Sequence, residues 1–305
     1  MEGYSFRPAS PGDVHIVHQL ISAQNLLDYG DSLRSVEDIQ RIWNSPPFDL
    51  GQDTQLAIAP GGQIAAYAEL RGQEDVFTYL SSEYQDPRLA AHLLNFLEER
   101  ARSLKSGTDP VELWGHAGFR NPLLIENFEN HGYTSDISFL VMQVELTETP
   151  QPPAWPAGIN VRPFVCDQDE QATYRTDEEA AEDKGYHAPL SFEKWITRMG
   201  MDRESFDPSI WFLACKQEEI AGVALNACKS DRQVAWVDHL SVRRAWRHQG
   251  IGRALLLHSF AEFFKRGIHT VKLSVDSKSL TNAPRLYESV GMKTSEKYHV
   301  YKKAI

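Results

Sequence analysis

Two glycines and a group of arginines lie where the chain could bind phosphate. Gly250 and Gly252 separate an apolar, β-branched strand at Val237–Val242 from a helix that we expect to begin at Arg253. The first N–H groups of a helix lack intrahelical partners and carry partial positive charge, and glycine lets a pyrophosphate approach them closely. The spacing therefore predicts a phosphate-binding turn, and the arginines that add charge to it are Arg243, Arg244, Arg247 and Arg253.

The residues of this turn exclude two common nucleotide-binding loops. A Walker A loop would need Lys-Ser/Thr directly after the last glycine, where the chain has Arg253 and Ala254. A Rossmann loop would need a third glycine at the position of Leu255. An ordinary strand–helix turn with solvated arginines remains an alternative.

A second strand and helix follow this turn. Thr270–Asp276 alternates between apolar and polar residues as a strand does, and Thr281–Glu288 has the features of a short helix. We expect Thr281 to be the N-cap of this helix and Gly291 to end it. The helix carries Tyr287, a residue that can donate a proton.

Both segments resemble motifs of the GNAT superfamily of acyl-CoA N-acyltransferases. Arg247–Gly252 matches the Gln/Arg-x-x-Gly-x-Gly/Ala signature, and Ala283–Met292 is similar to the second motif, with Leu280 where the family commonly has asparagine. The resemblance implies that acetyl-CoA binds as a co-substrate beside a strand that splays from its neighbour. The acetyl-CoA contacts that it implies are Leu240, Ser241, Val242, Arg247, His248, Gln249, Gly250, Ile251, Gly252, Arg253, Ala254 and Asn282.

The same resemblance implies two catalytic residues. Tyr287 matches the tyrosine that protonates the CoA sulfur, although a core tyrosine bonded to a backbone carbonyl is an alternative. Asp238 lies on the strand that carries the base in this family, although it could equally be a structural ion-pair partner. Strict alternation would put Asp238 and Leu240 on one face of the strand, and His239 on the other face with Val237 and Ser241.

The two halves of the chain resemble each other, which indicates an internal duplication. A short strand followed by Arg-Pro opens each half, at Tyr4–Pro8 and at Ile159–Pro163. We therefore expect two tandem GNAT-like α/β domains with mixed sheets, as in tandem GNAT proteins such as mycothiol synthase. The expected ranges are 1–146 and 159–305, joined by a Pro-rich linker at 147–158.

The first half lacks the residues that the chemistry needs. The segment that follows Val76–Leu80 contains no glycine and carries Glu83 and Asp86 where phosphates would need positive charge. Phe128 stands at the position that matches Tyr287. We therefore expect the first domain to be structural, without acetyl-CoA.

Composition and charge limit the other roles of the protein. The net charge of −11 argues against nucleic-acid binding, and no apolar run is long enough to span a membrane. The N-terminus lacks a signal-peptide pattern, so we expect a cytoplasmic protein, as a monomer or homodimer. No metal site is expected, because the cysteines show no CxxC spacing: Cys166, Cys215 and Cys228.

The expected function is acetyl transfer to a primary amine of a small molecule or peptide, by direct attack in a ternary complex. An acidic stretch at Glu178–Asp183 could form part of a lid for a cationic amine, or simply an exposed helix face. Two alternatives remain open. One is acetylation of a sugar–cysteine amine, as in mycothiol synthase, and the other is a non-catalytic acyl-CoA sensor.

Overall fold

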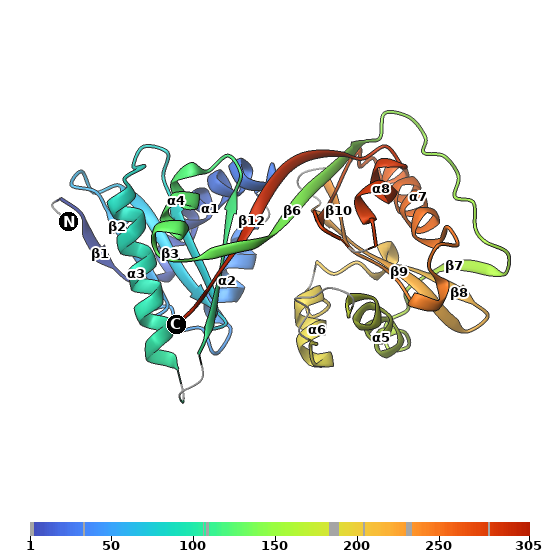
Figure 1. The fold of residues 1–305 in the computed structure, drawn as a ribbon, viewed down its shortest axis with the longest axis horizontal. Helices are drawn as coiled ribbons and strands as arrows, with labels where there is room; N and C mark the ends of the chain where they lie inside the picture. The colour runs from blue at the N-terminus through green and yellow to red at the C-terminus, as the bar shows by residue number, and fades with distance from the viewer. Residues whose placement is uncertain are drawn as a thin grey trace. The chain divides into compact units, whose positions relative to one another are not determined.

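A computed structural model gives the fold of the chain (Figure 1). It describes residues 3–32, 34–105, 107, 110–182, 189–203, 205–229, 234–279 and 281–305. The chain divides into two compact units, which are residues 1–140 with 296–305 (unit 1) and residues 141–295 (unit 2). Both are mixed α/β structures, so the predicted fold class is confirmed.

Unit 1 is a sheet with helices on both faces. Its strands follow the order β1-β2-β3-β4-β5-β12-β6. The strands are β1 (Ser5–Arg7), β2 (Thr54–Ile58), β3 (Ile64–Arg71), β4 (Asp75–Leu80), β5 (Glu112–Gly118), β6 (Thr134–Glu145) and β12 (Lys293–Ala304). The helices are α1 (Val14–Tyr29), α2 (Val36–Asn44), α3 (Pro87–Leu104) and α4 (Pro122–Asn130).

Unit 2 repeats this plan with the strand order β6-β11-β10-β9-β8-β7. The further strands are β7 (Ile159–Pro163), β8 (Phe212–Lys216), β9 (Glu219–Lys229), β10 (Val234–Val242) and β11 (Thr270–Asp276). The helices are α5 (Glu170–Ala181), α6 (Phe192–Met199), α7 (Ile251–Lys265) and α8 (Ala283–Glu288).

The helices of unit 1 bury apolar side chains on both faces of the sheet. Leu89, Leu93 and Leu97 recur at helical spacing on α3 and are fully buried in one core cluster. Val17 and Ile21 of α1 are fully buried in the second cluster. Each face of the sheet is therefore covered by an amphipathic helix, as a layered α/β unit requires.

In unit 2 the two helix layers differ in chemistry. Ile251 and Leu255 of α7 pack into an apolar cluster against the sheet. The buried residues of α5 are polar, namely Thr173, Thr176 and Asp177. Because buried polar side chains need hydrogen-bond partners, the interface between α5 and the sheet differs from an apolar core.

An ion pair at the start of the first helix recurs in both units. The Arg7 guanidinium donates two hydrogen bonds of 2.7 Å to Asp13, and the Arg162 guanidinium donates two of 2.6 and 2.7 Å to Asp169. The hydrogen bond from Arg7 holds the pKa of Asp13 well below its usual value. The same bidentate pair in the same place supports the duplication.

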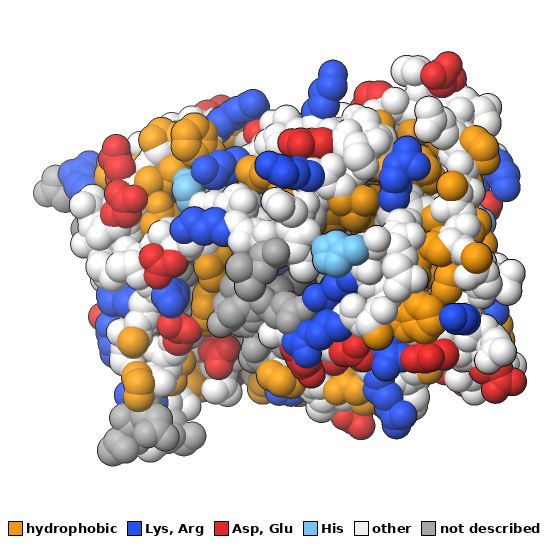
Figure 2. Space-filling view, turned by 45° about the vertical axis from the view of Figure 1, so that its right-hand side comes forward, with side chains coloured by type: hydrophobic (Ala, Val, Ile, Leu, Met, Phe, Trp, Pro, Cys, Tyr) orange, Lys and Arg blue, Asp and Glu red, His pale blue; other side chains and the backbone are white. Residues whose placement is uncertain are grey.

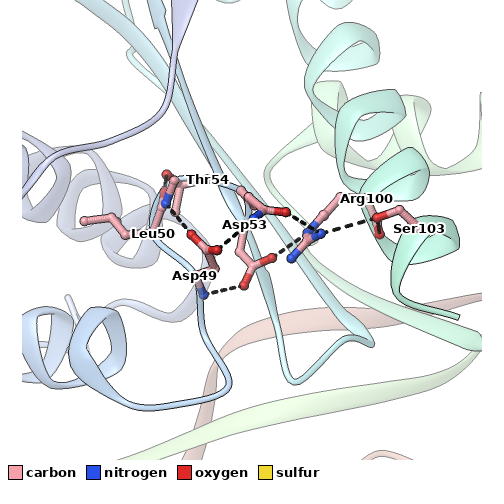
Figure 3. Close-up of polar contacts among 8 residues, drawn as sticks. Asp49, Leu50, Asp53, Thr54, Arg100 and Ser103 are labelled. Atoms are coloured by element: carbon pink, nitrogen blue, oxygen red, sulfur yellow. Dashed lines mark hydrogen bonds and ion pairs between the residues drawn. The ribbon is translucent and has the colours of Figure 1, made fainter. Parts of the chain in front are cut away.

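A polar network ties helix α3 to the start of β2 in unit 1 (Figure 3). Arg100 Nε donates to Asp53 Oδ1 at 2.7 Å, and Asp53 Oδ2 accepts the backbone N–H of Asp49 at 2.7 Å. The hydroxyl of Thr54 donates to the carbonyl of Leu50 at 2.6 Å. The nearly buried Asp53 carboxylate therefore has a partner on each oxygen.

Two long strands each belong to both units. β6 and β12 are neighbours in the strand order, and each of these twelve-residue strands crosses the division between the two units (Figure 1). Residues 296–304 of β12 pair antiparallel with β5 in unit 1, for example Tyr298 opposite Gly118. The compact units therefore differ from the expected ranges, because 296–305 lie with unit 1 and 141–158 with unit 2.

Candidate active site

In unit 2, neighbouring strands β10 and β11 stop pairing halfway along their length. Residues Val234 to Trp236 of β10 pair in parallel with β11. Beyond Trp236 the two described strands no longer pair, although β10 continues to Val242. The N–H of Arg243 donates to Ala221 on the β9 side. Because backbone groups alternate in direction along a strand, those of Leu240 and Val242 point away from β9, to the unpaired edge.

The start of α7 lies directly after this edge. The helix begins at Ile251, two residues before the predicted Arg253, and Gly250 is its N-cap with a φ of 89°. His248 also has a positive φ, of 60°. A Cβ on Gly252 would lie 3.2 Å from Leu286 Cδ2, so glycine permits the close approach of α7 and α8 here. The first-turn N–H groups of α7 follow a left-handed turn, a geometry that can bind an anion.

Arg243 and Arg244, two of the predicted arginines, have acidic partners. Arg243 bonds to Glu179 at 2.7 Å and to Glu219 at 2.6 Å, and Arg244 Nη1 lies 3.2 Å from Glu182. Acidic side chains of α5, its C-cap and β9 thus lie beside these two arginines, and their contribution of charge to the phosphate site stays a prediction. Arg253 lies in the first turn of α7, and Arg247 Nε donates to the carbonyl of Val242 at 3.0 Å.

The remaining predicted contacts differ in what they can offer a ligand. Ile251 and Ala254 are buried, so only their N–H groups could reach a ligand. The Gln249 side chain donates to the carbonyl of Ala245 at 3.2 Å. Asn282, rather than the predicted Thr281, is the N-cap of α8, with a φ of 57° and no side-chain capping bond.

Tyr287 is the buried residue of α8. Its ring is 8% exposed, and its hydroxyl makes no hydrogen bond with any residue that the structure describes. Burial raises the pKa of Tyr287 to about 12. The hydroxyl thus stays protonated at neutral pH and is not bound to a described backbone carbonyl.

A bulge in β10 changes the predicted faces of the strand. Val237 pairs with Asn226 and His239 with Leu225, so Asp238 has no opposite residue on β9 and its side chain is exposed. The prediction that Val237 shares a face with His239 is wrong, because the extra residue reverses the alternation. Asn226, opposite Val237, bonds to Ser259 of α7 at 3.1 Å, on the face away from α5.

His239 and Ser241 share a buried partner that the sequence analysis missed. The Asp177 carboxylate on α5 lies 2.7 and 2.9 Å from Nδ1 of His239. It also accepts from the Ser241 hydroxyl at 2.7 Å and from the Trp195 indole N–H at 2.9 Å. Since the Ser241 hydroxyl is engaged here, only the backbone of this predicted contact is left for acetyl-CoA.

Asp177 is ionised despite its burial. Its side chain is 4% exposed, and burial alone would raise its pKa. The His239 charge and the three hydrogen bonds outweigh this effect and lower the pKa to about 2. A sequence signal existed, because the inner face of α5 carries Asp177 with two threonines where apolar residues would be expected.

The described residues of the acidic stretch make contacts within unit 2. Glu178 accepts the N–H of Leu190 at 3.2 Å, and Glu179 and Glu182 pair with the arginines named above. Asp183 lies outside the described residues. The part of the expected lid that is described is therefore occupied by internal contacts.

The described residues contain neither a group of three or more potential metal ligands from His, Cys, Asp and Glu nor a helix long and apolar enough to cross a membrane. Acidic and basic side chains are interspersed on the face that Figure 2 shows.

Comparison with known proteins gives a consistent result. The acetyltransferase (GNAT) family profile matches residues 168–292. A mycothiol acetyltransferase of Geodermatophilus obscurus is 28% identical over 293 residues, covering 92% of this chain and 91% of the relative. One of Streptomyces coelicolor is 24% identical over 281 residues, covering 89% and 86%.

Two solved structures are similar over their whole length. A GCN5-related N-acetyltransferase from Sphaerobacter thermophilus is 31% identical, with a TM-score of 0.83, and the match covers 100% of this chain and 96% of that one. A tandem GNAT protein from the clavulanic acid biosynthesis pathway shares the fold with a TM-score of 0.74 at 13% identity, covering 99% and 98%.

Proposed function

Because this chain belongs to the GNAT family of N-acetyltransferases, we propose that unit 2 transfers the acetyl group of acetyl-CoA to a primary amine by direct attack in a ternary complex. The unpaired edge of β10, which ends at the N-terminus of α7, is the observation that carries this proposal. A strand edge can hydrogen-bond an extended pantetheine, and a helix N-terminus can hold a pyrophosphate.

Each part of this site has a role in the transfer. The Leu240 N–H, on the unpaired edge, would polarise the thioester carbonyl. The neutral amine attacks the carbonyl carbon and forms a tetrahedral intermediate. The C–S bond then breaks, and the departing CoA thiolate takes the proton of the Tyr287 hydroxyl. The nitrogen of the intermediate releases its extra proton as the amide forms, and this proton returns to the Tyr287 oxygen. Before the attack, a base near the β10 bulge must take a proton from the ammonium form of the acceptor.

The names of the relatives suggest one acceptor class. Two mycothiol acetyltransferases match most of this chain, at 24–28% identity. We therefore propose a cysteine amine, as part of a sugar–cysteine conjugate, as the first acceptor to test. Other primary amines of small molecules or peptides remain in the proposed class.

The first experiment measures the binding of acetyl-CoA and the transfer of its acetyl group. Calorimetric titration should give one site, and mass spectrometry should detect N-acetylated product and free CoA with L-cysteinamide or glucosamine as acceptor. Arg253→Ala should weaken acetyl-CoA binding about tenfold, as expected for the loss of a charged hydrogen bond.

Lys265→Ala, at the other end of α7, is the matched control and should bind acetyl-CoA like the wild type. Absence of binding by the wild type would refute an acetyl-CoA site. Binding without transfer to any amine in a broad panel would favour the acyl-CoA sensor.

A further inference from the structure

The Asp177 carboxylate accepts hydrogen bonds from three side chains on two elements of unit 2. His239 and Ser241 reach it from β10, and Trp195 reaches it from α6. Both carboxylate oxygens are engaged, and Oδ1 and Oδ2 each lie within 2.9 Å of His239 Nδ1. A carboxylate held in this way cannot rotate without losing several hydrogen bonds, so its position is fixed.

This contact determines the form of the imidazole. An ionised carboxylate accepts a hydrogen bond, so Nδ1 of neutral His239 carries the proton and Nε2 carries the lone pair. The side chain of His239 is 27% exposed, whereas that of Asp177 is 4% exposed. One end of the imidazole is therefore fixed in the interior, and the residue remains accessible to a proton donor.

His239 also lies beside the expected reaction centre. It directly precedes Leu240, whose backbone faces the unpaired edge of β10. The bulge at Asp238 brings His239 to the α5 face, where Asp177 lies. Asp238 itself is exposed, whereas the hydrogen bonds to the Asp177 carboxylate come from His239, Ser241 and Trp195.

Unit 1 provides an internal comparison. In each unit, the residue directly after the strand donates its N–H to the neighbouring strand. Counted back from that residue, Phe77 of unit 1 occupies the place of His239 of unit 2. Counting from the N-caps of α1 and α5, Ile21 occupies the place of Asp177. Ile21 is fully buried, and Phe77 packs against the same apolar cluster. In unit 1 the helix thus packs on the sheet with apolar side chains at both of these positions.

We propose that Asp177 and His239 form the proton-accepting pair of unit 2. His239 Nε2 takes a proton from the acceptor ammonium, which frees the nitrogen lone pair for attack and leaves an imidazolium that later releases the proton to solvent. Asp177 is a positioning residue that fixes the tautomer and stabilises the imidazolium. This inference rests on the proposed acetyl transfer and replaces Asp238 as its base.

The test uses the full chain with acetyl-CoA and L-cysteinamide, and kcat and KM are measured by mass spectrometry. His239→Asn keeps an N–H that can bond Asp177 but has no basic nitrogen, and His239→Ala leaves space for added imidazole. Each should lower kcat about 100-fold or more, with acetyl-CoA affinity unchanged within about twofold. Imidazole should restore part of the rate to His239→Ala alone.

Further variants separate positioning from folding. Asp177→Asn should lower kcat at least about tenfold and alter the pH profile, because the tautomer is no longer fixed. His269→Asn is the matched control, since Nδ1 of this histidine also bonds a fixed acceptor, the Leu146 carbonyl at 3.0 Å, at the paired end of β11. Thermal melts and acetyl-CoA titration verify that each variant folds.

Three outcomes would overturn the proposal. The first is a kcat of the His239 variants within about threefold of wild type. The second is the expected loss of kcat in the His239 variants, but with no rescue by imidazole and an unchanged pH profile, which would indicate a structural role. The third is loss of the pH-dependent step in Asp238→Asn alone, which would make Asp238 the base. If the wild type acetylates no amine, the proposed function itself fails, before any variant is compared.

Discussion

The side-chain amide of Gln24 bonds to the backbone of Leu80 at the unpaired edge of β4 in unit 1. Its Oε1 accepts the Leu80 N–H at 3.3 Å, and its Nε2 donates to the carbonyl of Thr78 at 3.0 Å. β4 and β5 pair only at Asp75 and Val76 and then separate, as β10 and β11 do in unit 2. In unit 1 the edge on which acetyl-CoA would have to bind is thus already hydrogen-bonded by the protein.

The counterpart of Gln24 in unit 2 cannot make this contact. Gln24 lies eleven residues after the N-cap Asp13 of α1, and the residue eleven after the N-cap Asp169 of α5 is Ala180. An alanine has no polar side-chain atom to bond the strand edge. We propose on this ground that unit 1 is the structural copy and that unit 2 alone binds acetyl-CoA.

The first prediction concerns the number of acetyl-CoA sites. Calorimetry should give one acetyl-CoA per chain, in wild type and in Gln24→Ala alike. Opening the β4 edge does not create a phosphate site, because Asp86 caps α3 where a pyrophosphate would lie. A second site in either protein would contradict the structural assignment of unit 1.

The second prediction concerns Tyr287 as the acid. Tyr287→Phe should lower kcat about 10- to 100-fold with little change in acetyl-CoA affinity, since the variant cannot protonate the thiolate. The pKa of about 12 means that the hydroxyl remains protonated until far above neutral pH. The wild-type rate should therefore not fall on the alkaline side below about pH 11 through loss of this proton. An unchanged kcat in Tyr287→Phe would remove its role as acid.

Local patterns predicted most elements of the site. The Thr270–Asp276 strand has the predicted bounds, and the strand before the loop differs only at its start. Alternation and helical spacing are properties of neighbouring residues, so a single segment of sequence is enough to predict its own secondary structure. The position of Tyr287 on a helix after the next parallel strand could be predicted for the same reason.

The features that the sequence did not predict depend on partners far away in the chain. The bulge at Asp238 is set by the pairing of β10 with β9, and nothing in Val237–Val242 marks it. Asp177 meets His239 from 62 residues away. β12 pairs with β5 through contacts that no local pattern encodes. Local periodicity could therefore predict where the site lies, but not which side chains meet there.

The third prediction follows from the lowered pKa of Asp177. Its unfolded value is near 3.8 and its folded value about 2, so the contribution to stability is present above about pH 4 and is lost as the pH falls through about 2. The difference corresponds to about 2 kcal/mol. Urea unfolding of wild type should lose this amount between pH 4 and 2, relative to Asp177→Asn. If the stability of the two proteins changed with pH in parallel, the pKa of Asp177 would not be lowered in the folded state.

The fourth prediction concerns the Asp53–Arg100 pair that ties α3 to β2. Arg100→Met should lower the free energy of unfolding by about 3 kcal/mol, because it leaves the buried Asp53 carboxylate without its charged partner. The matched control is Arg88→Met on the same helix, whose side chain is 84% exposed and pairs with Asp86. That change should lower the free energy of unfolding far less, since solvent screens an exposed pair. Urea denaturation measures both values, and equal losses would show that burial does not set the strength of the Asp53 contact.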